Sequence, residues 1–392
     1  MTPRVFLVAG EVSGDIYGAD LAAALRRLRP DVELVGVGGP RMAAAGVRCL
    51  ADSAEWGLIG WVDILPRLPQ MLARLVRVRR AITRLAPAVL VLIDFPGFNL
   101  ALAERLGGRF PVAYFLPPMV SIRRGERARR IARLGMRLLA VFPFEADAYR
   151  AAHADVTFIG HPAVDRLRPS GTPEEIRRRL NLPVEGPLLA LLPGSRRREL
   201  RRHLPVIVRA LAAVRARVPG VRAVLPVATP AQRALAEDAM RAAAVPIALM
   251  EGGGQAGYDA LAAADFAVIT SGTATLEALL VGVPGVVIYR ASRVDFWIAR
   301  RIVRVGWAGL PSLLAGREVM PELLQHELTP RHLGAVIVEW LGDPGRRARL
   351  REDLLALRDR LGPPGAVERA AMEILRLARL LGSEPSSTIQ KT

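Results

Sequence analysis

The feature that most constrains the fold is a repeated succession of short apolar runs, turns containing Gly or Pro, and helical stretches rich in Ala, Leu and Arg. In Val5–Ala9 and Leu188–Leu192 every residue is apolar. Parallel strands covered by helices on both faces have this pattern, whereas half-exposed strands alternate between apolar and polar residues. The sequence therefore predicts an α/β fold built on doubly wound parallel sheets.

Strand-like runs occur in both halves of the chain. The expected strands are Val5–Ala9, Val32–Val37, Ala88–Phe95, Val112–Leu116, Leu138–Phe142 and Val156–Ile159, followed by Leu188–Leu192, Ala223–Val227, Ile247–Met250, Phe266–Thr270 and Gly285–Tyr289. The segment from Arg166 to Glu175 is rich in Pro, Gly and Ser and is interpreted as a linker or hinge. We expect two Rossmann-like domains that face each other across a cleft, with ligands at the carboxyl ends of the strands.

The expected domains are residues 1–165, residues 166–345, a pair of Arg- and Leu-rich helices over residues 346–381, and a flexible tail over residues 382–392. The helices are expected to pack back on the N-terminal domain or on a partner. The sequence leaves open whether the protein is a homodimer.

Composition excludes several classes of protein. With 51% hydrophobic residues the chain is not intrinsically disordered. A single cysteine, Cys49, excludes an intramolecular disulfide and a thiolate zinc cluster. No apolar run reaches the roughly 18–20 residues of a membrane span, and the N-terminus lacks a signal-peptide core, which predicts a soluble or peripheral cytoplasmic protein.

The formal net charge of +18 favours anionic partners. Nucleic acid is not expected, because the arginines are spread over helices without an aromatic platform or a known nucleic-acid module. The stretch from Trp56 to Arg80 combines Trp, Ile and Leu with Arg, which suits an interfacial membrane contact. A core helix with a solvated Arg face explains that stretch equally well.

Two motifs of the first half place polar residues at strand ends. After the first strand, Glu11, Ser13 and Gly14 lie in a turn that opens a helix; a plain strand-to-helix turn is the alternative. Asp94 lies at the mouth of a buried strand, where it either caps the next helix or acts as a general base. His161 is interpreted as a turn or hinge residue rather than a catalytic one.

Two motifs of the second half are suited to binding a nucleoside diphosphate. Gly194, Ser195 and Arg196 join a strand to a helix, so backbone amides and a guanidinium fork meet at a helix start. In the second motif, small residues precede Glu277, which could accept hydrogen bonds from ribose; the plainer interpretations are a solvated basic helix start and an exposed helix acid. The remaining candidate UDP-binding residues are Gln255, Tyr258, Ser271, Gly272 and Thr273. Neither GxGxxG nor GxxxxGK[ST] occurs.

The motifs GEVSGD, VGVGGPRM, DFPGFN, FIGHP, LLPGSRRREL, SGTATLEAL and GLPSLLAGREVMPELLQ, in this order from residue 5 to about 330, resemble those of the lipid-A-disaccharide synthase family. The resemblance implies an inverting glycosyltransferase of the GT-B architecture, peripheral on the inner face of the cytoplasmic membrane. No acidic triad such as DxD lies near these motifs, so the sequence does not require a divalent ion, and no cofactor is expected. The implied donor is UDP-2,3-diacylglucosamine and the implied acceptor 2,3-diacylglucosamine 1-phosphate. The implied products are the β-1,6-linked disaccharide 1-phosphate and UDP.

By this resemblance, Asp94 and Arg196 match essential residues of the family and Glu277 matches the acid of its nucleotide-binding motif. Glu11, Ser13 and Asn99 match positions that line the N-terminal side of the cleft, and Gly14 belongs to the same motif. The chain departs from the family at Gly97, at Ser312 and in the segment from Phe115 to Ile131, which lacks the family's Trp pair.

The expected mechanism has Asp94 accept the proton of the acceptor 6-hydroxyl while Arg196 and the Gly194 and Ser195 amides stabilise the departing UDP. Closure about the linker would exclude water. Alternatives are another GT-B enzyme that acts on a UDP-sugar, such as a UDP-sugar 2-epimerase or a transferase with a different lipid acceptor, and an inactive membrane-associated homologue.

Overall fold

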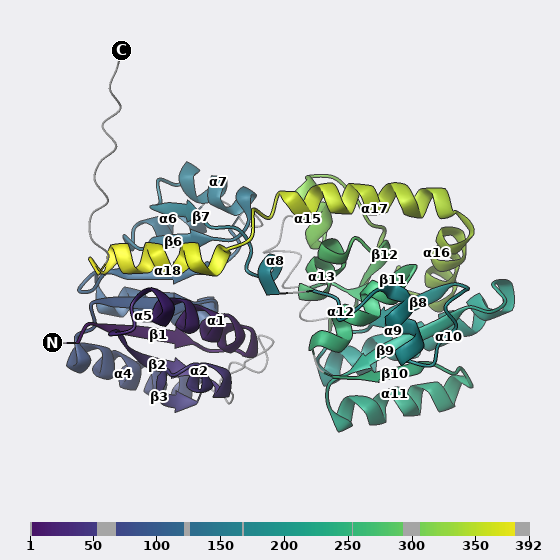
Figure 1. Ribbon diagram of the computed structural model, residues 1–392, viewed down its shortest axis with the longest axis horizontal. Helices are drawn as coiled ribbons and strands as arrows, with labels where there is room; N and C mark the ends of the chain where they lie inside the picture. Colours follow the sequence, from purple (N-terminus) through teal and green to yellow (C-terminus); the bar gives the residue numbers. More distant parts are fainter. Residues whose placement is uncertain are drawn as a thin grey trace, which may run out of the picture. The chain divides into compact units, whose positions relative to one another are not determined.

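A computed structural model describes residues 2–52, 68–120, 126–166, 168–252, 254–292 and 306–380. The chain forms two compact units (Figure 1). Unit 1 comprises Met1–Pro162 and Leu361–Thr392, and unit 2 comprises Ala163–Arg360. Each unit contains one parallel sheet with helices on it, as the apolar runs predict.

Unit 1 has a seven-stranded sheet in the order β3-β2-β1-β4-β5-β6-β7. Its strands are β1 (Arg4–Ala9), β2 (Glu33–Gly38), β3 (Arg48–Asp52), β4 (Val89–Ile93), β5 (Val112–Phe115), β6 (Arg137–Ala140) and β7 (Val156–Phe158). Its helices are α1 (Val12–Leu28), α2 (Pro40–Ala44), α4 (Leu68–Leu85), α5 (Pro96–Leu106), α6 (Glu126–Ala132), α7 (Pro143–Ala151) and α18 (Ala366–Leu377). The order reverses between β1 and β4, so this is the topological switch point of the sheet, where α/β proteins bind ligands.

Unit 2 has a six-stranded sheet in the order β10-β9-β8-β11-β12-β13. Its strands are β8 (Leu188–Leu192), β9 (Arg222–Val227), β10 (Ala248–Glu251), β11 (Phe266–Thr270), β12 (Gly285–Tyr289) and β13 (Glu322–Leu324). Its helices are α8 (Ala163–Arg166), α9 (Pro173–Arg179), α10 (Arg197–Arg217), α11 (Pro230–Ala243), α12 (Gly254–Ala263), α13 (Thr273–Val281), α15 (Leu310–Ala315), α16 (Pro330–Gly342) and α17 (Pro344–Asp359). The switch point of this sheet lies between β8 and β11.

The last two helices belong to different units. α17 packs against α13 and α15, whereas α18 packs against α1 (Figure 1). Arg137 of β6 forms an ion pair of 2.7 Å with Glu373 of α18, and Arg369 of α18 donates to the carbonyl of Ile159 at 2.9 Å. The chain therefore returns to unit 1 after residue 360, and not at residue 346 where the expected C-terminal region begins. Of the two expected helices, only α18 lies in unit 1, and α17 lies in unit 2.

Residues 168–175, which the structure describes, are held by hydrogen bonds and do not have the free backbone of a hinge. Ser170 donates its backbone N–H to Asp259 of α12 at 2.9 Å, and Gln255 of α12 donates to the carbonyl of Arg168, also at 2.9 Å. Thr172 forms a capping box with Glu175 at the start of α9. The hinge interpretation is therefore corrected for the part after residue 167: turn-forming residues serve here as a helix cap and as anchors to unit 2.

A buried carboxylate joins two turns of unit 1. Asp15, in the first turns of α1, is 6% exposed and accepts backbone N–H bonds from Gly39 at 2.8 Å, Met42 at 3.0 Å and Arg41 at 3.1 Å. These amides open α2, so Asp15 serves as the cap of a helix other than its own. This contact explains physically why GEVSGD and GGPRM occur together in the sequence.

We expect Asp15→Ala to lower the free energy of unfolding by about 2–4 kcal/mol, because it leaves the buried amides of Gly39 and Met42 and the partly buried amide of Arg41 without this acceptor. Asp15→Asn should lose less, since its amide oxygen can still accept. Urea denaturation of both variants measures the effect. Asp155→Ala, which removes an exposed carboxylate paired with Arg137, is the control and should change little; an equal loss in Asp155→Ala and Asp15→Ala would contradict the capping role.

Candidate active site

The sequence-predicted residues of unit 1 gather at its switch point. β1 ends at Ala9 and leads into Glu11, Ser13 and Gly14, and β4 pairs with β1 and ends at Ile93, directly before Asp94. Ser13 donates its hydroxyl hydrogen to Asp94 Oδ2 at 3.2 Å. The carboxyl ends of neighbouring parallel strands thus bring residues 81 positions apart into contact.

The backbone of Asp94 is held in an uncommon conformation. Asp94 has φ +48° and Phe95 has φ +49°, both in the left-handed region that non-glycine residues rarely adopt. The Asp94 carbonyl accepts two side-chain hydrogen bonds, from Asn99 Nδ2 at 2.7 Å and from the Tyr114 hydroxyl at 2.8 Å. Two buried donors therefore maintain a conformation that costs on the order of 1–3 kcal/mol per residue, and they direct the start of α5.

The carboxylate of Asp94 is half-buried. Burial raises its pKa above the ordinary value of an aspartate, and the hydrogen bonds from the Phe95 amide and the Ser13 hydroxyl oppose that shift. A carboxylate with a raised pKa that stays ionised near neutral pH is a stronger base than a solvated one. Asp94 does not cap α5, because Phe95 takes the N-cap position there.

The two glycines next to Asp94, Gly10 and Gly97, differ in how tightly their surroundings are packed. A Cβ at Gly10 would lie 2.0 Å from the Phe95 ring, so only glycine lets the β1–α1 turn approach β4 this closely. Glu11 is the N-cap residue of α1 and is half-buried. At Gly97, by contrast, a Cβ would meet nothing within 4 Å, so the absence of a side chain there is not enforced by packing.

Unit 2 places its glycine-arginine turn directly after β8. Gly194 has φ +113°, and a Cβ there would lie 2.4 Å from the carboxylate of Glu199. Glu199 accepts from the Arg196 backbone N–H at 3.3 Å and from the Arg196 guanidinium at 3.2 Å. Ser195 is exposed, and its carbonyl accepts from Gln232 at 2.6 Å. Arg196 thus begins α10 from an exposed position with a guanidinium that Glu199 orients.

The second small-residue turn follows β11, the neighbour of β8. Gly272 has φ +142°, faces open space, and is the N-cap of α13; Thr273 is the first residue of that helix and is exposed. Ser271 donates to the carbonyl of Ala308 at 2.7 Å, which fixes the turn against the segment before α15. The switch point of unit 2 therefore carries two helix N-termini, both of which favour anions.

Glu277 lies one turn into α13 and is half-buried. Burial raises its pKa to about 7. Tyr258 of α12 is 3% exposed, and burial raises its pKa to about 12. Gln255 is exposed, but its amide nitrogen is engaged by Asp259 and by the carbonyl of Arg168, both at 2.9 Å. Of these three side chains, Glu277 has the charge and position to accept hydrogen bonds from a ligand at this turn.

Sequence reasoning gave no role to Tyr114 and His203. Tyr114 lies within an apolar strand, where the sequence pattern predicts a core residue, and His203 lies inside a helix, away from any strand end. Their partners come from strand ends distant in sequence, so only the pairing of the strands could have identified them. Among the residues that the structure describes, no group of three or more His, Cys, Asp or Glu side chains is placed to hold a metal ion.

Solved structures with similar folds include the S. aureus MnaA–UDP co-structure, with a TM-score of 0.66, 13% identity and coverage of 98% of this chain and 99% of that chain. The calicheamicin glycosyltransferase has a TM-score of 0.60, 16% identity and coverage of 97% and 100%. Two parallel-sheet α/β units with helices at the C-terminus, each with its polar turns at the switch point, define the GT-B fold of glycosyltransferases and their relatives.

The sequence comparisons identify the family. The model of the lipid-A-disaccharide synthetase family matches residues 5–361. The lipid-A-disaccharide synthase of Myxococcus xanthus is 41% identical over 96% of this chain and 97% of that protein, and that of Syntrophus aciditrophicus is 39% identical over 96% and 98%. The chain belongs to the lipid-A-disaccharide synthase family, and it is a glycosyltransferase of lipid A biosynthesis. These findings do not favour the alternatives of another UDP-sugar enzyme or an inactive homologue.

Proposed function

We propose that the protein transfers the 2,3-diacylglucosaminyl group of UDP-2,3-diacylglucosamine to the 6-hydroxyl of 2,3-diacylglucosamine 1-phosphate. The observation that carries the mechanism is the half-buried Asp94 carboxylate, hydrogen-bonded to Ser13 at the switch point of unit 1. Unit 1 would bind the acceptor and its lipid, and unit 2 would bind the UDP-sugar.

The reaction is a single displacement with inversion. The acceptor oxygen forms a bond to the anomeric carbon as the bond from that carbon to the diphosphate oxygen breaks, and the hydroxyl proton passes to Asp94. The electron pair leaves with UDP, whose diphosphate gains charge in the transition state. Arg196 and the amides of Gly194 and Ser195 are the groups that would stabilise that charge. Unit 1 thus supplies the base, and unit 2 supplies the groups that stabilise the leaving group.

The decisive experiment measures UDP released from UDP-2,3-diacylglucosamine in detergent micelles, with and without the 1-phosphate acceptor, and the mass of the lipid product. Acceptor-dependent UDP release together with a tetraacyl disaccharide 1-phosphate would support the proposed substrates. UDP binding without turnover would contradict the proposed acceptor, and absence of both would contradict the proposed donor.

Glu277 is proposed to accept hydrogen bonds from the ribose hydroxyls of the donor. Its pKa is raised to about 7, so the carboxylate, which is the better acceptor, predominates above that pH and is lost as the pH falls through about 7. We expect UDP affinity to fall from pH 8 to pH 6, and Glu277→Gln to weaken binding roughly 10-fold at pH 8.

Isothermal titration with UDP at pH 8 and at pH 6 tests this prediction. The UDP phosphate also titrates, but it does so equally with both proteins, so the difference between wild type and Glu277→Gln isolates the side chain. The two proteins should therefore converge at pH 6. Parallel pH dependences in wild type and Glu277→Gln would remove Glu277 from the ribose site.

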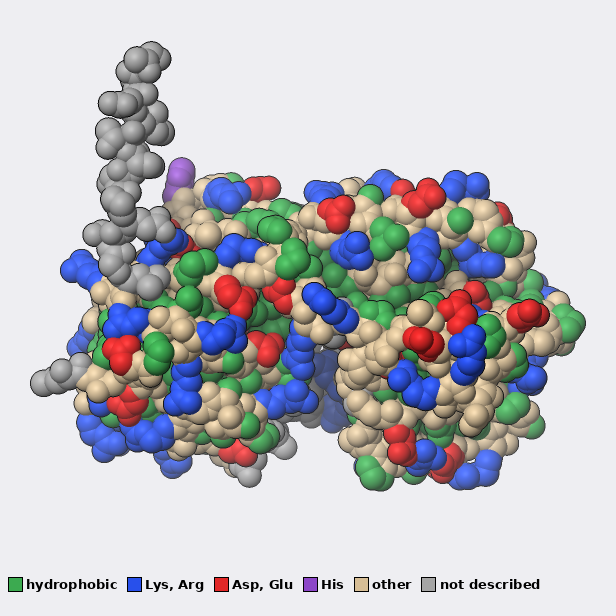
Figure 2. Space-filling view, viewed as in Figure 1, with side chains coloured by type: hydrophobic (Ala, Val, Ile, Leu, Met, Phe, Trp, Pro, Cys, Tyr) green, Lys and Arg blue, Asp and Glu red, His purple; other side chains and the backbone are tan. Residues whose placement is uncertain are grey.

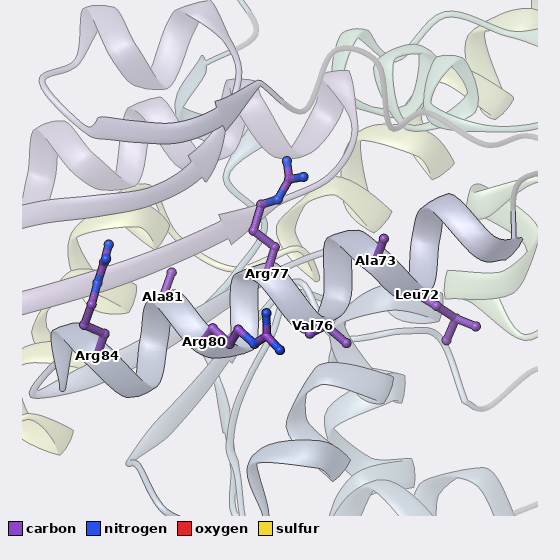
Figure 3. Close-up of a pocket in the computed structure, with 7 residues that line it drawn as sticks. All are labelled: Leu72, Ala73, Val76, Arg77, Arg80, Ala81 and Arg84. Atoms are coloured by element: carbon purple, nitrogen blue, oxygen red, sulfur yellow. The ribbon is translucent and has the colours of Figure 1, made fainter.

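We also propose that α4 contacts an anionic membrane surface. This helix contains five arginines and no acidic residue. Its buried face includes Leu75, Val78 and Ile82, whereas Leu72 is 52% exposed. A groove of about 620 Å³ runs along the exposed face (Figure 3) and is lined by Leu72, Ala73, Val76, Arg77, Arg80, Ala81 and Arg84. Apolar side chains next to guanidinium groups are typical of interfacial helices.

The α4 surface differs from the rest of the basic surface in that its helix contains no acidic residue. On the face shown in Figure 2, arginines are spread over both units with acidic side chains among them. Of the stretch predicted to contact the membrane, residues 53–67, which include Trp56 and Trp61, lie outside the described residues. None of the helices over the described ranges is both long and apolar enough to cross a membrane.

Replacing Arg77, Arg80 and Arg84 together by Ser should weaken binding to anionic phosphatidylglycerol vesicles roughly 100-fold, since each basic residue near such a surface contributes about 1 kcal/mol. Sedimentation with vesicles measures the binding, and vesicles of neutral phosphatidylcholine should bind wild type weakly.

The matched control removes the same charge elsewhere. Arg150, Arg241 and Arg317 are exposed and lie outside α4. They pair with Asp147 within α7, with Asp238 within α11 and with Asp353 of α17. Their triple replacement by Ser should leave most of the vesicle binding intact. If both triple variants lose the same affinity, net charge rather than α4 governs the contact.

A further inference from the structure

His203 is a fully buried polar side chain in the middle of α10, at 0% exposure. Its Nδ1 lies 2.7 Å from the carbonyl oxygen of Pro193, which directly follows β8, and 3.2 Å from Thr270 Oγ1 at the end of β11. Its Nε2 lies 3.0 Å from the backbone nitrogen of Arg290, which directly follows β12. One imidazole thus contacts the carboxyl ends of three adjacent strands.

These partners define the protonation state of the ring. The Arg290 amide can only donate, so Nε2 accepts, and the Pro193 carbonyl can only accept, so Nδ1 carries the proton. The imidazole is therefore neutral, and burial lowers its pKa accordingly. The charged groups that act on it are Glu199 and Arg202 of α10 and Arg290 beyond β12; β8 and β11 face it with Pro193 and Thr270, which do not titrate.

The sheet itself cannot make this connection. β11 lies between β8 and β12, so no ladder hydrogen bond joins the Pro193 carbonyl to the Arg290 amide. Both groups lie past the last paired residues of their strands, and buried backbone groups need partners. The ring therefore satisfies a carbonyl and an amide on strands that are not neighbours.

The turn that His203 fixes is the one proposed to bind the diphosphate. Pro193 directly precedes Gly194, Ser195 and Arg196, and Thr270 directly precedes Ser271. We propose that His203 is a positioning residue of the UDP site: its neutral imidazole holds the turn after β8 against the ends of β11 and β12. This inference rests on the proposed role of unit 2 in binding UDP.

Three substitutions separate positioning from packing. His203→Phe keeps an aromatic ring of similar shape and removes all three polar contacts, those with Pro193, Thr270 and Arg290. His203→Asn places an amide NH₂ near the position of Nδ1 and keeps the donor to Pro193. His203→Gln places an amide oxygen near the position of Nε2 and keeps only the acceptor for Arg290. The readouts are UDP affinity by isothermal titration at pH 8 and the thermal unfolding temperature.

His203→Phe should weaken UDP binding roughly 10- to 100-fold, as expected when a binding turn shifts by about 1 Å. His203→Asn should restore affinity to within about threefold of wild type, whereas His203→Gln should stay close to the Phe variant. A purely structural role would lower the unfolding temperature without separating Asn from Gln in UDP affinity. His332→Phe, at an exposed position of α16, is the control and should bind UDP like wild type.

Wild-type UDP affinity in folded His203→Phe would overturn the inference and leave the proposed function intact. If His203→Phe does not fold, equal affinities of His203→Asn and His203→Gln would overturn it instead. Failure of the wild-type protein to bind UDP would contradict the proposed function of unit 2, and the inference with it. The wild-type titration thus distinguishes the two failures.

Discussion

Asp94→Asn should lower kcat by roughly 10²–10⁴, the contribution expected of a general base, while UDP affinity stays at the wild-type level. The substitution replaces a carboxylate oxygen by an amide nitrogen, which cannot accept the acceptor's hydroxyl proton. Turnover of UDP-2,3-diacylglucosamine with saturating 1-phosphate acceptor measures kcat, and isothermal titration measures UDP affinity.

The backbone at Asp94 should keep its conformation in this substitution. Asp94 has φ +48°, and Asn is among the few residues that tolerate the left-handed region, so the strained turn should persist. The Asn99 and Tyr114 donors bind the Asp94 carbonyl, which the substitution leaves in place. The variant should therefore keep its thermal unfolding temperature, and a loss of kcat would report the missing carboxylate.

Asp31→Asn is the matched control, because it makes the same chemical change at an exposed carboxylate that pairs with Arg29 in unit 1. It should retain wild-type kcat. Unimpaired turnover in Asp94→Asn would exclude Asp94 as the base. A fall in UDP affinity as large as the fall in kcat would indicate that Asp94 acts on the donor rather than on the acceptor.

The central strands could be predicted from sequence because helices cover both of their faces. β4 and β8 are buried at every residue and read as continuous apolar runs. β3 and β13 escaped prediction for the opposite reason. β3 is an edge strand whose residues are alternately exposed and half-buried, and β13 is an edge strand of three residues that includes Glu322. Short edge strands have too few buried side chains to leave an apolar run.

The candidate site was predictable where a polar residue interrupts an apolar strand end. Asp94 and the turn around Arg196 stand out in this way, and the structure places both at the switch points of their sheets. Residues that act on the backbone of another segment leave no such signal. Asp15, Tyr114 and His203 bind amides or carbonyls 20 or more positions away in at least one contact each, and local sequence pattern carries no information on those pairings.

Arg196→Ala should weaken UDP binding roughly 10- to 100-fold and lower kcat roughly 10²–10³-fold. The binding loss is that of a charge-assisted hydrogen bond to a diphosphate. The loss in kcat arises because the diphosphate carries more charge in the transition state than in the bound donor, so a guanidinium stabilises the transition state more. Titration with UDP and turnover at saturating donor measure the two effects separately.

Arg197→Ala is the matched control, because it removes the same charge from the neighbouring residue. Arg197 is the next residue, is exposed, and carries the same charge at the first position of α10, whereas Arg196 is the N-cap residue whose guanidinium Glu199 orients at 3.2 Å. If charge near the helix start were sufficient, both substitutions would weaken UDP binding equally. Arg196→Lys tests the fork: it keeps the charge but offers no bidentate geometry, so its kcat should lie between those of wild type and Arg196→Ala.

The position of these arginines also argues for an anionic ligand. Helix N-termini carry partial positive charge, which makes arginines in the first turn of a helix unfavourable by themselves. α10 begins with Arg196 as its cap, Arg197 as its first residue, and only Glu199 as an acid in the first turn. A bound diphosphate would remove that repulsion, so UDP should raise the unfolding temperature of wild type more than that of Arg196→Ala. Equal shifts in the two proteins would place the diphosphate elsewhere in unit 2.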